Sequence, residues 1–310
     1  MPPSILFGCA SIGCKFTTLS SVQSLLATIT SLGITHLDTA ARYGQNYGAG
    51  DPNLGAVGDS EILLGQAKAA QSGFILDSKI LFLGNGEMET TAEKVEASTT
   101  TTLSRLRLDK VNVMYIHAPD MLTPVAEQAA AMDTQFRVGR MEKLGISRFN
   151  AEMLREYLDI CRENGYVFPS VYQGQYSLVN RKAEENLIPL LREEGIRFVA
   201  FSPLASGFLT VGDDGKPTNG VLDHYYGGEK FREAVERLKK TLKPLGLSAT
   251  EAALRWIVYH SVLGDEDALI LGASREEHIV NSMEIVKKGP LDEKVVQAVE
   301  QVWEDVRERS

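Results

Sequence analysis

Five polar residues follow strand-like segments of the sequence, at positions where the packed interior of a sheet would not select them. Taken singly, each has an ordinary structural explanation, because an aspartate can cap a helix, a lysine can be solvated and a histidine can be a satisfied core residue. Their segments are consecutive strands of one predicted barrel, so the side chains meet on one face, and that shared placement favours a catalytic site. The five residues are Asp38, Lys79, His117, Ser147 and Gln173.

These residue types can reduce a carbonyl group. Tyr43 lies five residues after Asp38, in the segment that leaves the same strand, so its phenol can reach the barrel mouth. A free tyrosine has a pKa of about 10, and a neighbouring ammonium from Lys79 would lower it and make the phenol a better acid. Asp38 would pair with Lys79 and keep it charged in a closed pocket. His117, as a neutral donor, would orient the carbonyl oxygen while Tyr43 protonates it and hydride reaches the carbon.

Short apolar segments alternate with longer amphipathic ones, which is typical of repeated strand-helix units around a parallel sheet. Eight such units predict an α/β fold, a (β/α)8 TIM barrel, as a single domain over residues 1–310. The predicted strands are 5–8, 34–38, 75–79, 111–117, 141–147, 170–173, 197–201 and 269–272. Helices are predicted at 21–32, 60–69, 91–106, 151–164 and 184–194, from apolar spacing and from glycine stops.

Two segments do not fit this repeat, 45–59 and 210–229, and both are rich in turn-forming residues. In a barrel such loops commonly cover the face that holds the active site. We interpret 45–59 as a cover that orders on binding substrate through Tyr47, Pro52 or Leu54. The alternative is a surface insertion without a role in catalysis, because long loops have a small entropic cost.

Composition supports one large core and argues against several classes of partner. With 310 residues, 44% of them hydrophobic, the chain is long enough for an α/β barrel. The net charge of -9, without a run of like charges, makes nucleic acid and anionic membranes poor partners. The three cysteines, Cys9, Cys14 and Cys161, are too few for a disulfide framework or a zinc cluster and suit the reducing cytoplasm.

The sequence also argues against a membrane protein. No segment approaches the roughly 18 to 20 apolar residues of a membrane span. The apolar stretch 5–12 lacks the basic region and the cleavage pattern of a leader, so we interpret it as a core strand.

Four motifs reproduce the catalytic set in the arrangement of a known family. In chain order they are HLDTAARYG at 36–44, the pattern Ser60, Glu61, Leu64 and Gly65, LDSKI at 76–80, and YIHAPD at 115–120. They resemble the motifs of the aldo-keto reductases. The resemblance implies that the catalytic residues are Asp38, Tyr43, Lys79 and His117, and that a nicotinamide cofactor binds on the barrel face.

The middle and the end of the chain resemble one branch of that family. The segments VFPSVYQGQYSLVNR at 167–181 and FSPLASGFLT at 201–210, with LGAS at 271–274, are similar to the aflatoxin-aldehyde reductases. By this resemblance Ser147, Arg148 and Gln173 hold the nicotinamide carboxamide and Phe201 stacks on its ring. The family more often has asparagine where Arg148 stands and often tyrosine where Phe201 stands; arginine at the former position occurs in the potassium-channel β-subunit branch.

The same resemblance implies that the cofactor is NADPH. Residues 202–212 match the loop over the pyrophosphate, although Val211 and Gly212 replace its usual lysine. Ser274 matches the serine at the 2′-phosphate, at a helix start where free N–H groups favour anions; a plain helix cap is the alternative. His278, Asn281 and Ser282 depart from the usual residues. The cofactor residues carried over are Ser147, Arg148, Gln173, Phe201, Ser202, Pro203, Leu204, Ser206, Gly207, Ser274, Arg275, His278 and Ser282.

Three functions compete as explanations of this sequence. The first is NADPH-dependent reduction of a small aldehyde, including dialdehydes or dicarbonyls, by an enzyme that the resemblance allows to be a homodimer. The second is a cofactor-bearing regulatory subunit like the potassium-channel β subunits, for which Arg148 is a mild indication and the intact catalytic set a counter-argument. The third, a metal-dependent barrel hydrolase, needs several histidines at the barrel mouth, and the chain has five in all, most in loops or helices.

Overall fold

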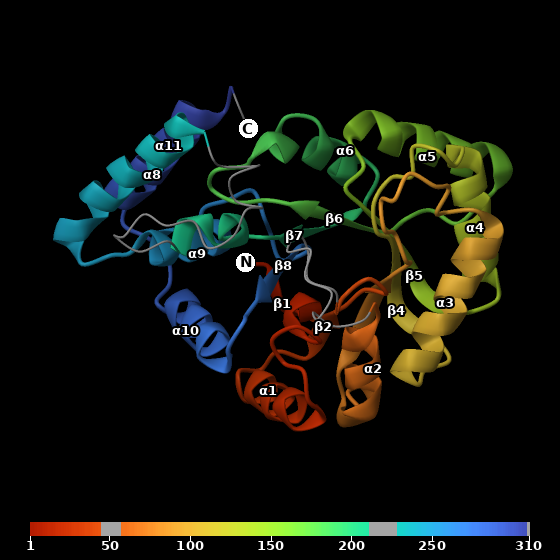
Figure 1. Ribbon diagram of the computed structural model, residues 1–310. Coiled ribbons are helices and arrows are strands. Elements are labelled where there is room, and N and C mark those ends of the chain that lie inside the picture. Colours follow the sequence, from red (N-terminus) through yellow and green to blue (C-terminus); the bar gives the residue numbers. More distant parts are fainter. Residues whose placement is uncertain (45–56, 211–227, 309–310) are drawn as a thin grey trace.

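Eight parallel strands close into a barrel in chain order (Figure 1). The computed structural model describes residues 1–44, 57–210 and 228–308. Each strand pairs with the next one along the chain, and β8 pairs with β1, so the predicted (β/α)8 barrel is confirmed. The strands are β1 Ser4–Gly8, β2 His36–Asp38, β3 Ile75–Lys79, β4 Val111–Ile116, β5 Met141–Ser147, β6 Val171–Gln175, β7 Arg197–Phe201 and β8 Ala268–Gly272.

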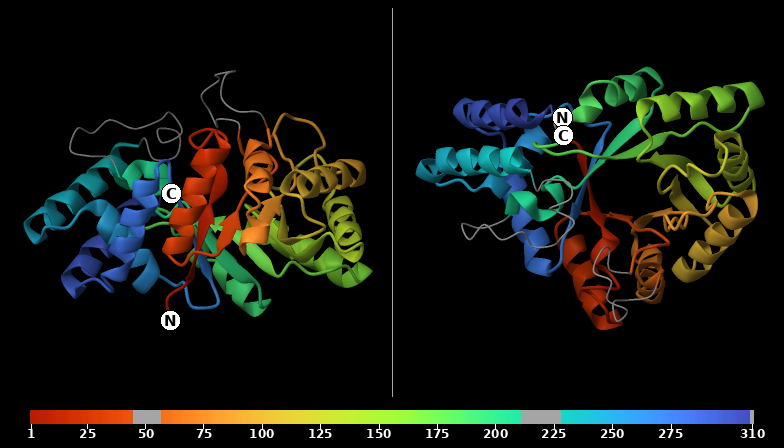
Figure 2. Two further views of the ribbon diagram at one scale, coloured as in Figure 1. Left: turned by 90° about the horizontal axis from the view of Figure 1, so that it is seen from below. Right: turned by 45° about the horizontal axis from the view of Figure 1, so that its top comes forward.

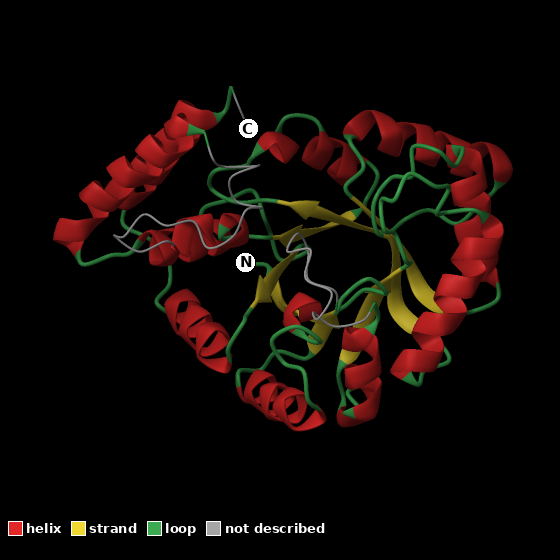
Figure 3. Ribbon diagram, viewed as in Figure 1, coloured by secondary structure: helices red, strands yellow, loops and turns green. Residues whose placement is uncertain are grey.

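Helices surround the barrel and cover its outer face (Figure 3). Helices α8 and α11 pack side by side and extend from one side of the barrel (Figures 1 and 2). Within the described ranges, no helix combines the length and the apolar character needed to cross a membrane. The helices are α1 Leu19–Ser31, α2 Asp59–Gln66, α3 Ala92–Leu106, α4 Val125–Arg137, α5 Ala151–Asn164, α6 Leu187–Glu193, α8 Glu229–Leu242, α9 Ala249–Tyr259, α10 Glu276–Lys287 and α11 Glu293–Val306.

Several predicted boundaries need correction, most of them by one to three residues. The helix predicted at 184–194 is divided into a 3-10 turn, Lys182–Glu184, and α6, because the ring of Pro189 clashes with a helical carbonyl four residues earlier. β2 begins at His36 and not at residue 34, since the Ile34 amide donates back to the Ile29 carbonyl. β6 continues to Gln175, so Gln173 lies within the strand and not at its end.

The two loops predicted from turn-forming residues lie mostly outside the described residues. This applies to the interpretation of 45–59 as a cover, with Tyr47, Pro52 and Leu54, and to most of 210–229. Val211 and Gly212, at the end of the predicted pyrophosphate loop, also lie outside.

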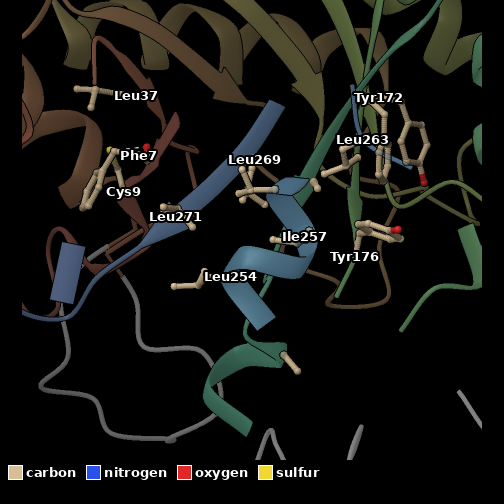
Figure 4. Close-up of a cluster of buried hydrophobic side chains, with 14 of the residues drawn as sticks. Phe7, Cys9, Leu37, Tyr172, Tyr176, Leu254, Ile257, Leu263, Leu269 and Leu271 are labelled. Atoms are coloured by element: carbon tan, nitrogen blue, oxygen red, sulfur yellow. Dashed lines mark hydrogen bonds between the residues drawn. The ribbon is translucent and has the colours of Figure 1, made fainter. Parts of the chain in front are cut away.

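Two apolar layers hold the barrel together. The larger core lies between the sheet and the helices; Figure 4 shows Leu269 and Leu271 of β8 beside Leu254 and Ile257 of α9. A separate cluster comes from five strands, as expected for side chains that face the barrel interior. Its members are Leu6, Val113, Tyr115, Val171, Val199, Ala268 and Ile270, and Phe201 packs against it.

Tyr115 is the largest side chain of this inner cluster, and its ring fits because β5 has a glycine opposite. A Cβ atom on Gly145 would lie 2.3 Å from Cδ1 of Tyr115. The ring has no free space to move into, since Tyr115 is fully buried. Gly145 therefore sets the packing beneath the polar end of the barrel.

We expect Gly145→Ala to destabilise the protein by about 1 to 3 kcal/mol, the usual cost of overpacking a core. Gly264→Ala is the matched control, because no described heavy atom outside its chain neighbours lies within 4 Å of a Cβ built there. Chemical denaturation of the two variants measures the difference. Equal free energies of unfolding would show that the barrel interior accommodates the methyl group.

Candidate active site

A buried ion pair between two neighbouring strands forms the centre of the site. Lys79 ends β3 and Asp38 ends β2, and Lys79 Nζ lies 2.7 Å from Asp38 Oδ2. The side chains are only 1% and 3% exposed. Nζ also donates to the Thr39 carbonyl at 2.8 Å. Burial opposes the charge on Lys79, but the Asp38 carboxylate and the Tyr43 phenol outweigh it and hold the pKa of Lys79 above its usual range.

The second oxygen of Asp38 is bonded across the barrel. Gln173 Nε2 donates to Asp38 Oδ1 at 2.7 Å. Because β2 and β6 lie opposite each other in a ring of eight strands, this bond spans the barrel mouth. Both carboxylate oxygens therefore have fixed partners, and the lysine, the aspartate and the glutamine form one rigid unit.

Tyr43 is held against this unit by the segment that leaves β2. Its ring centroid lies 4.9 Å from Lys79 Nζ, and a hydrogen bond that Nζ donates to the Tyr43 phenol oxygen contributes to the raised pKa of Lys79. The Tyr43 carbonyl accepts from the Gly58 and Ser60 amides at 3.1 and 3.4 Å. The phenol and the ammonium that we expected to meet are thus in contact.

His117 contacts Tyr43 and lies directly after β4. The two rings meet edge to face, with centroids 5.8 Å apart and planes at 81°. His117 is 5% exposed, and its Nδ1 has no hydrogen-bond partner among the described residues. Burial, with the positive charges of Lys79, Arg148 and Arg42, holds the pKa of His117 well below its usual value, so the ring is neutral at pH 7.

Helix α2 fixes the two strands that carry the ion pair. Ser60 lies 2.8 Å from the Thr39 hydroxyl and donates to the Cys9 carbonyl at 3.2 Å. Glu61 accepts from the hydroxyl of Ser78, the residue before Lys79, at 2.7 Å. The Ser-Glu pair that the sequence motif contains therefore supports the site without entering it.

The predicted nicotinamide residues also come together. Ser147 and Gln173 are register partners on β5 and β6. The backbone at Arg148 is left-handed, with φ at 64°, and its amide donates to the Gln173 carbonyl at 3.3 Å. This turn places the Arg148 guanidinium 5.6 Å from the centroid of the Phe201 ring.

The segment after β7 has an unusual backbone. Ser202, Ala205 and Ser206 have φ values of 57°, 50° and 57°, and Gly207 follows at 99°. Left-handed conformations cost a residue other than glycine roughly 1 to 2 kcal/mol each. Such turns direct successive N–H groups to one side and form concave anion sites. Pro203 and Leu204 complete the segment, and the Ala205 amide donates to the Ser202 carbonyl.

The predicted 2′-phosphate residues follow β8, with one correction. Helix α10 begins at Glu276 and its N-cap is Arg275, so Ser274 is neither in the helix nor its cap. The Ser274 hydroxyl lies 3.2 Å from Nδ1 of His278. Ser282 donates to the His278 carbonyl at 2.8 Å and thus faces its own helix. Ser274, Arg275 and His278 are exposed and remain accessible to a ligand.

Sequence reasoning missed three residues that the structure brings to this region. Arg42 acts on His117 through its charge, Tyr115 lies beside its register partner Lys79 with its ring centroid 5.7 Å from Nζ, and Asp120 organises the loop after His117. The strand alternation on β4 could have indicated Tyr115, because it lies two residues before His117. Across residues 1–44, 57–210 and 228–308, no group of three or more His, Cys, Asp or Glu side chains could hold a metal ion.

The sequence of this chain matches a known protein family. The model of the aldo/keto reductase family matches residues 4–304. An aldo-keto reductase of Pseudocercospora fijiensis is 32% identical over 91% of this chain and 97% of its own length. Aflatoxin B1 aldehyde reductase member 2 of Rattus norvegicus is 32% identical over 97% of this chain and 84% of its own length. Aflatoxin B1 aldehyde reductase member 4 of Homo sapiens is 32% identical over 97% of this chain and 94% of its own length.

The lowered pKa of His117 predicts an acid-sensitive stability. The unfolded histidine titrates near pH 6.5 and the folded one well below it, so the unfolded state binds the extra proton first. The stability is therefore complete above about pH 6.5 and decreases as pH falls toward the folded pKa. Relative to His117→Gln, the wild type should lose about 2 kcal/mol between pH 7.5 and pH 5. Urea denaturation at both pH values measures this loss.

The control is His278→Gln, which removes an exposed histidine. This variant should follow the wild type at both pH values. If His117→Gln also follows the wild type, the His117 ring titrates normally in the folded protein.

Proposed function

The chain belongs to the aldo/keto reductase family, and on that premise we propose that it reduces aldehydes to alcohols with NADPH. One observation carries the proposal: Tyr43 contacts both the ring of His117 and the Lys79 ammonium, which Asp38 holds in place. An acid, a cation that strengthens it and a neutral hydrogen-bonding ring are the groups that carbonyl reduction requires. In the family the cofactor is a nicotinamide dinucleotide; NADPH is our proposal for this chain.

Tyr43 is the proton donor in this proposal. A substrate oxygen that enters between Tyr43 and His117 would accept the phenolic proton as it gains electrons. The Lys79 ammonium stabilises the phenolate that remains. Asp38 and Gln173 keep that ammonium fixed, so its charge is oriented before the substrate arrives.

His117 would bind and orient the substrate and would not supply the proton. Its ring is neutral at pH 7 because burial and three nearby cations lower its pKa. A neutral imidazole can donate one hydrogen bond to a carbonyl oxygen. The buried Nδ1, unpartnered within the described chain, indicates a site that a ligand completes, since buried polar atoms are nearly always bonded.

The residues fit a dinucleotide. Ser147 and Gln173 would hold the carboxamide, and Phe201, beside Arg148, offers an aromatic face. The segment at 202–207 would bind the pyrophosphate through backbone amides other than those of Ala205 and Gly207, which donate within the segment. Bound NADPH supplies the hydride that reaches the carbonyl carbon. The 2′-phosphate would lie at Ser274, Arg275 and His278, with Ser282 behind them.

The proposed substrate is a small aldehyde, including dialdehydes and dicarbonyls. The support is the similarity to proteins named aflatoxin B1 aldehyde reductases and the intact acid at Tyr43. The free thiols of Cys9, Cys14 and Cys161 suit a cytoplasmic enzyme.

We expect Tyr43→Phe to lower kcat by roughly 100- to 10,000-fold, the usual contribution of a positioned acid. The dissociation constant of NADPH should change little, because no proposed cofactor contact is removed. Steady-state NADPH oxidation with an aldehyde panel and fluorescence titration of NADPH measure the two quantities. Tyr259→Phe is the matched control; its hydroxyl donates to the Val286 carbonyl at 2.7 Å, Tyr259 is not one of the proposed site residues, and turnover should be retained. Tyr43 is not the principal acid if Tyr43→Phe keeps more than about a tenth of the wild-type rate.

The 2′-phosphate assignment predicts a preference for NADPH over NADH. Arg275→Ala should weaken NADPH binding about tenfold, the value of a lost charge-assisted hydrogen bond, and leave NADH binding unchanged. Lys287→Ala removes an exposed cation from the far end of the same helix and should affect neither cofactor. Isothermal titration with both cofactors gives the four constants. The assignment is wrong if the wild type binds NADPH and NADH equally.

A further inference from the structure

Asp120 is the most extensively bonded carboxylate near the site, and nothing in the catalytic scheme above uses it. It lies three residues after His117, in the loop between β4 and α4, and is 4% exposed. Its oxygens accept from the amides of Glu89 and Thr90 at 2.6 and 3.0 Å. They also accept from the amides of Leu122 and Thr123 at 2.9 and 3.3 Å, and from both threonine hydroxyls.

These bonds join two loops that begin at catalytic residues. One loop follows Lys79 on β3, and the other begins with His117 after β4. The side-chain amide of Gln128, on α4, donates through Nε2 to the carbonyls of Asp120 and Thr123 at 2.9 and 2.7 Å. The loop after His117 is therefore held by two sets of bonds. One set is to the Asp120 carboxylate within the loop, and the other is from Gln128 on the helix that follows.

Glu89 is a second buried carboxylate that accepts from backbone amides, in the loop after Lys79. Asp120 binds its amide, while the buried Glu89 carboxylate accepts from the amides of Gly84 and Asn85 at 2.6 and 3.3 Å and from that of Leu83. The residue before Leu83 is Phe82, whose carbonyl accepts from Arg42 at 3.3 Å. Arg42 directly precedes Tyr43. The two carboxylates thus connect the loop of His117 to the loop of Tyr43 through the loop after Lys79.

We propose that Asp120 is a positioning residue for carbonyl reduction, and that Glu89 extends its effect to the segment beside Arg42 and Tyr43. The inference rests on the function proposed above. Two buried carboxylates that satisfy seven backbone amides cannot shift without releasing the loops. A displacement of about 1 Å between His117 and Tyr43 would then lower the rate by up to about 100-fold.

The alternative is that Asp120 only stabilises the fold, and Asp133 provides the control for it. Asp133 lies on α4, is 5% exposed, and accepts from the Val167 amide at 2.8 Å and from Arg137 at 2.6 Å. Asp133→Asn therefore removes a buried, bonded carboxylate outside the three loops. Both aspartate variants should lower the melting temperature, but their effects on catalysis should differ.

We expect Asp120→Asn to lower kcat/KM for aldehydes about 10- to 100-fold, with the dissociation constant of NADPH within about twofold of wild type. Asp133→Asn should keep the wild-type kcat/KM. Glu89→Gln keeps one oxygen acceptor in the same place, so it should fold and show a smaller loss of kcat/KM in the same direction. Assays are run well below the lowest melting temperature.

Amide hydrogen exchange provides a readout that does not depend on turnover. Asp120→Asn should speed exchange at 89–90 and also at 83–85, whereas Glu89→Gln should speed it at 83–85 alone. If exchange at 83–85 is unchanged in Asp120→Asn, the connection through Glu89 does not exist. If Asp120→Asn and Glu89→Gln keep the kcat/KM of Asp133→Asn, both carboxylates are structural and the proposal is overturned.

Failure of the proposed function would look different. A wild type that oxidises NADPH with none of the aldehydes tested refutes aldehyde reduction, and a positioning role in that reaction falls with it. The exchange data would then still decide whether the three loops are coupled.

Discussion

The buried ion pair between Asp38 and Lys79 is the interaction on which the site depends. Two charges removed from water cost several kcal/mol each unless every hydrogen-bonding position is filled. Here Lys79 reaches the carboxylate and the Thr39 carbonyl, and the second carboxylate oxygen receives Gln173. The pair can exist only where three strands bring these groups within bonding distance. A closed barrel meets this requirement because β2 and β6 face each other across its mouth.

The surrounding residues exclude water from this ion pair and restrict its motion. An apolar layer lies beneath it, with Tyr115 against Lys79 and Gly145 making room for the ring. Ser60 and Glu61 hold the two strands from the side. The loops above are joined by Asp120 and Glu89. The apolar layer, helix α2 and the bonded loops thus surround the ion pair of Asp38 and Lys79. The electrostatics of the site follow from the geometry of the barrel.

Much of this architecture is predictable from residue patterns. The boundaries of β3, β5 and β7 agree with those predicted, because short apolar runs are followed there by polar residues or turn signals. The meeting of Asp38, Lys79, His117 and Gln173 followed from the rule that strand ends of a parallel barrel share one face. The family resemblance, confirmed by the match over residues 4–304, added the expected roles.

Other features depend on contacts that a linear pattern does not contain. Asp120 and Glu89 stand in loops, where acidic residues ordinarily face water, and only the fold makes them buried acceptors for distant amides. The break before α6 depends on Pro189, which a count of apolar residues ignores. Ser202, Ala205 and Ser206 have a left-handed backbone although none of them is a glycine. Their residue types therefore do not predict this conformation. Such a conformation exists only because surrounding contacts impose it.

These exceptions have a common physical meaning. Folding alone favours relaxed backbone angles and bonded polar atoms, yet Ser202, Ala205 and Ser206 are strained and Nδ1 of His117 has no partner within the described chain. Both lie just beyond the carboxyl ends of barrel strands, where the apolar layers end. Local departures from the most stable arrangement concentrate where a protein binds or reacts. The barrel supplies the stability that allows them, since its two apolar cores lie outside and beneath the polar layer and do not depend on it.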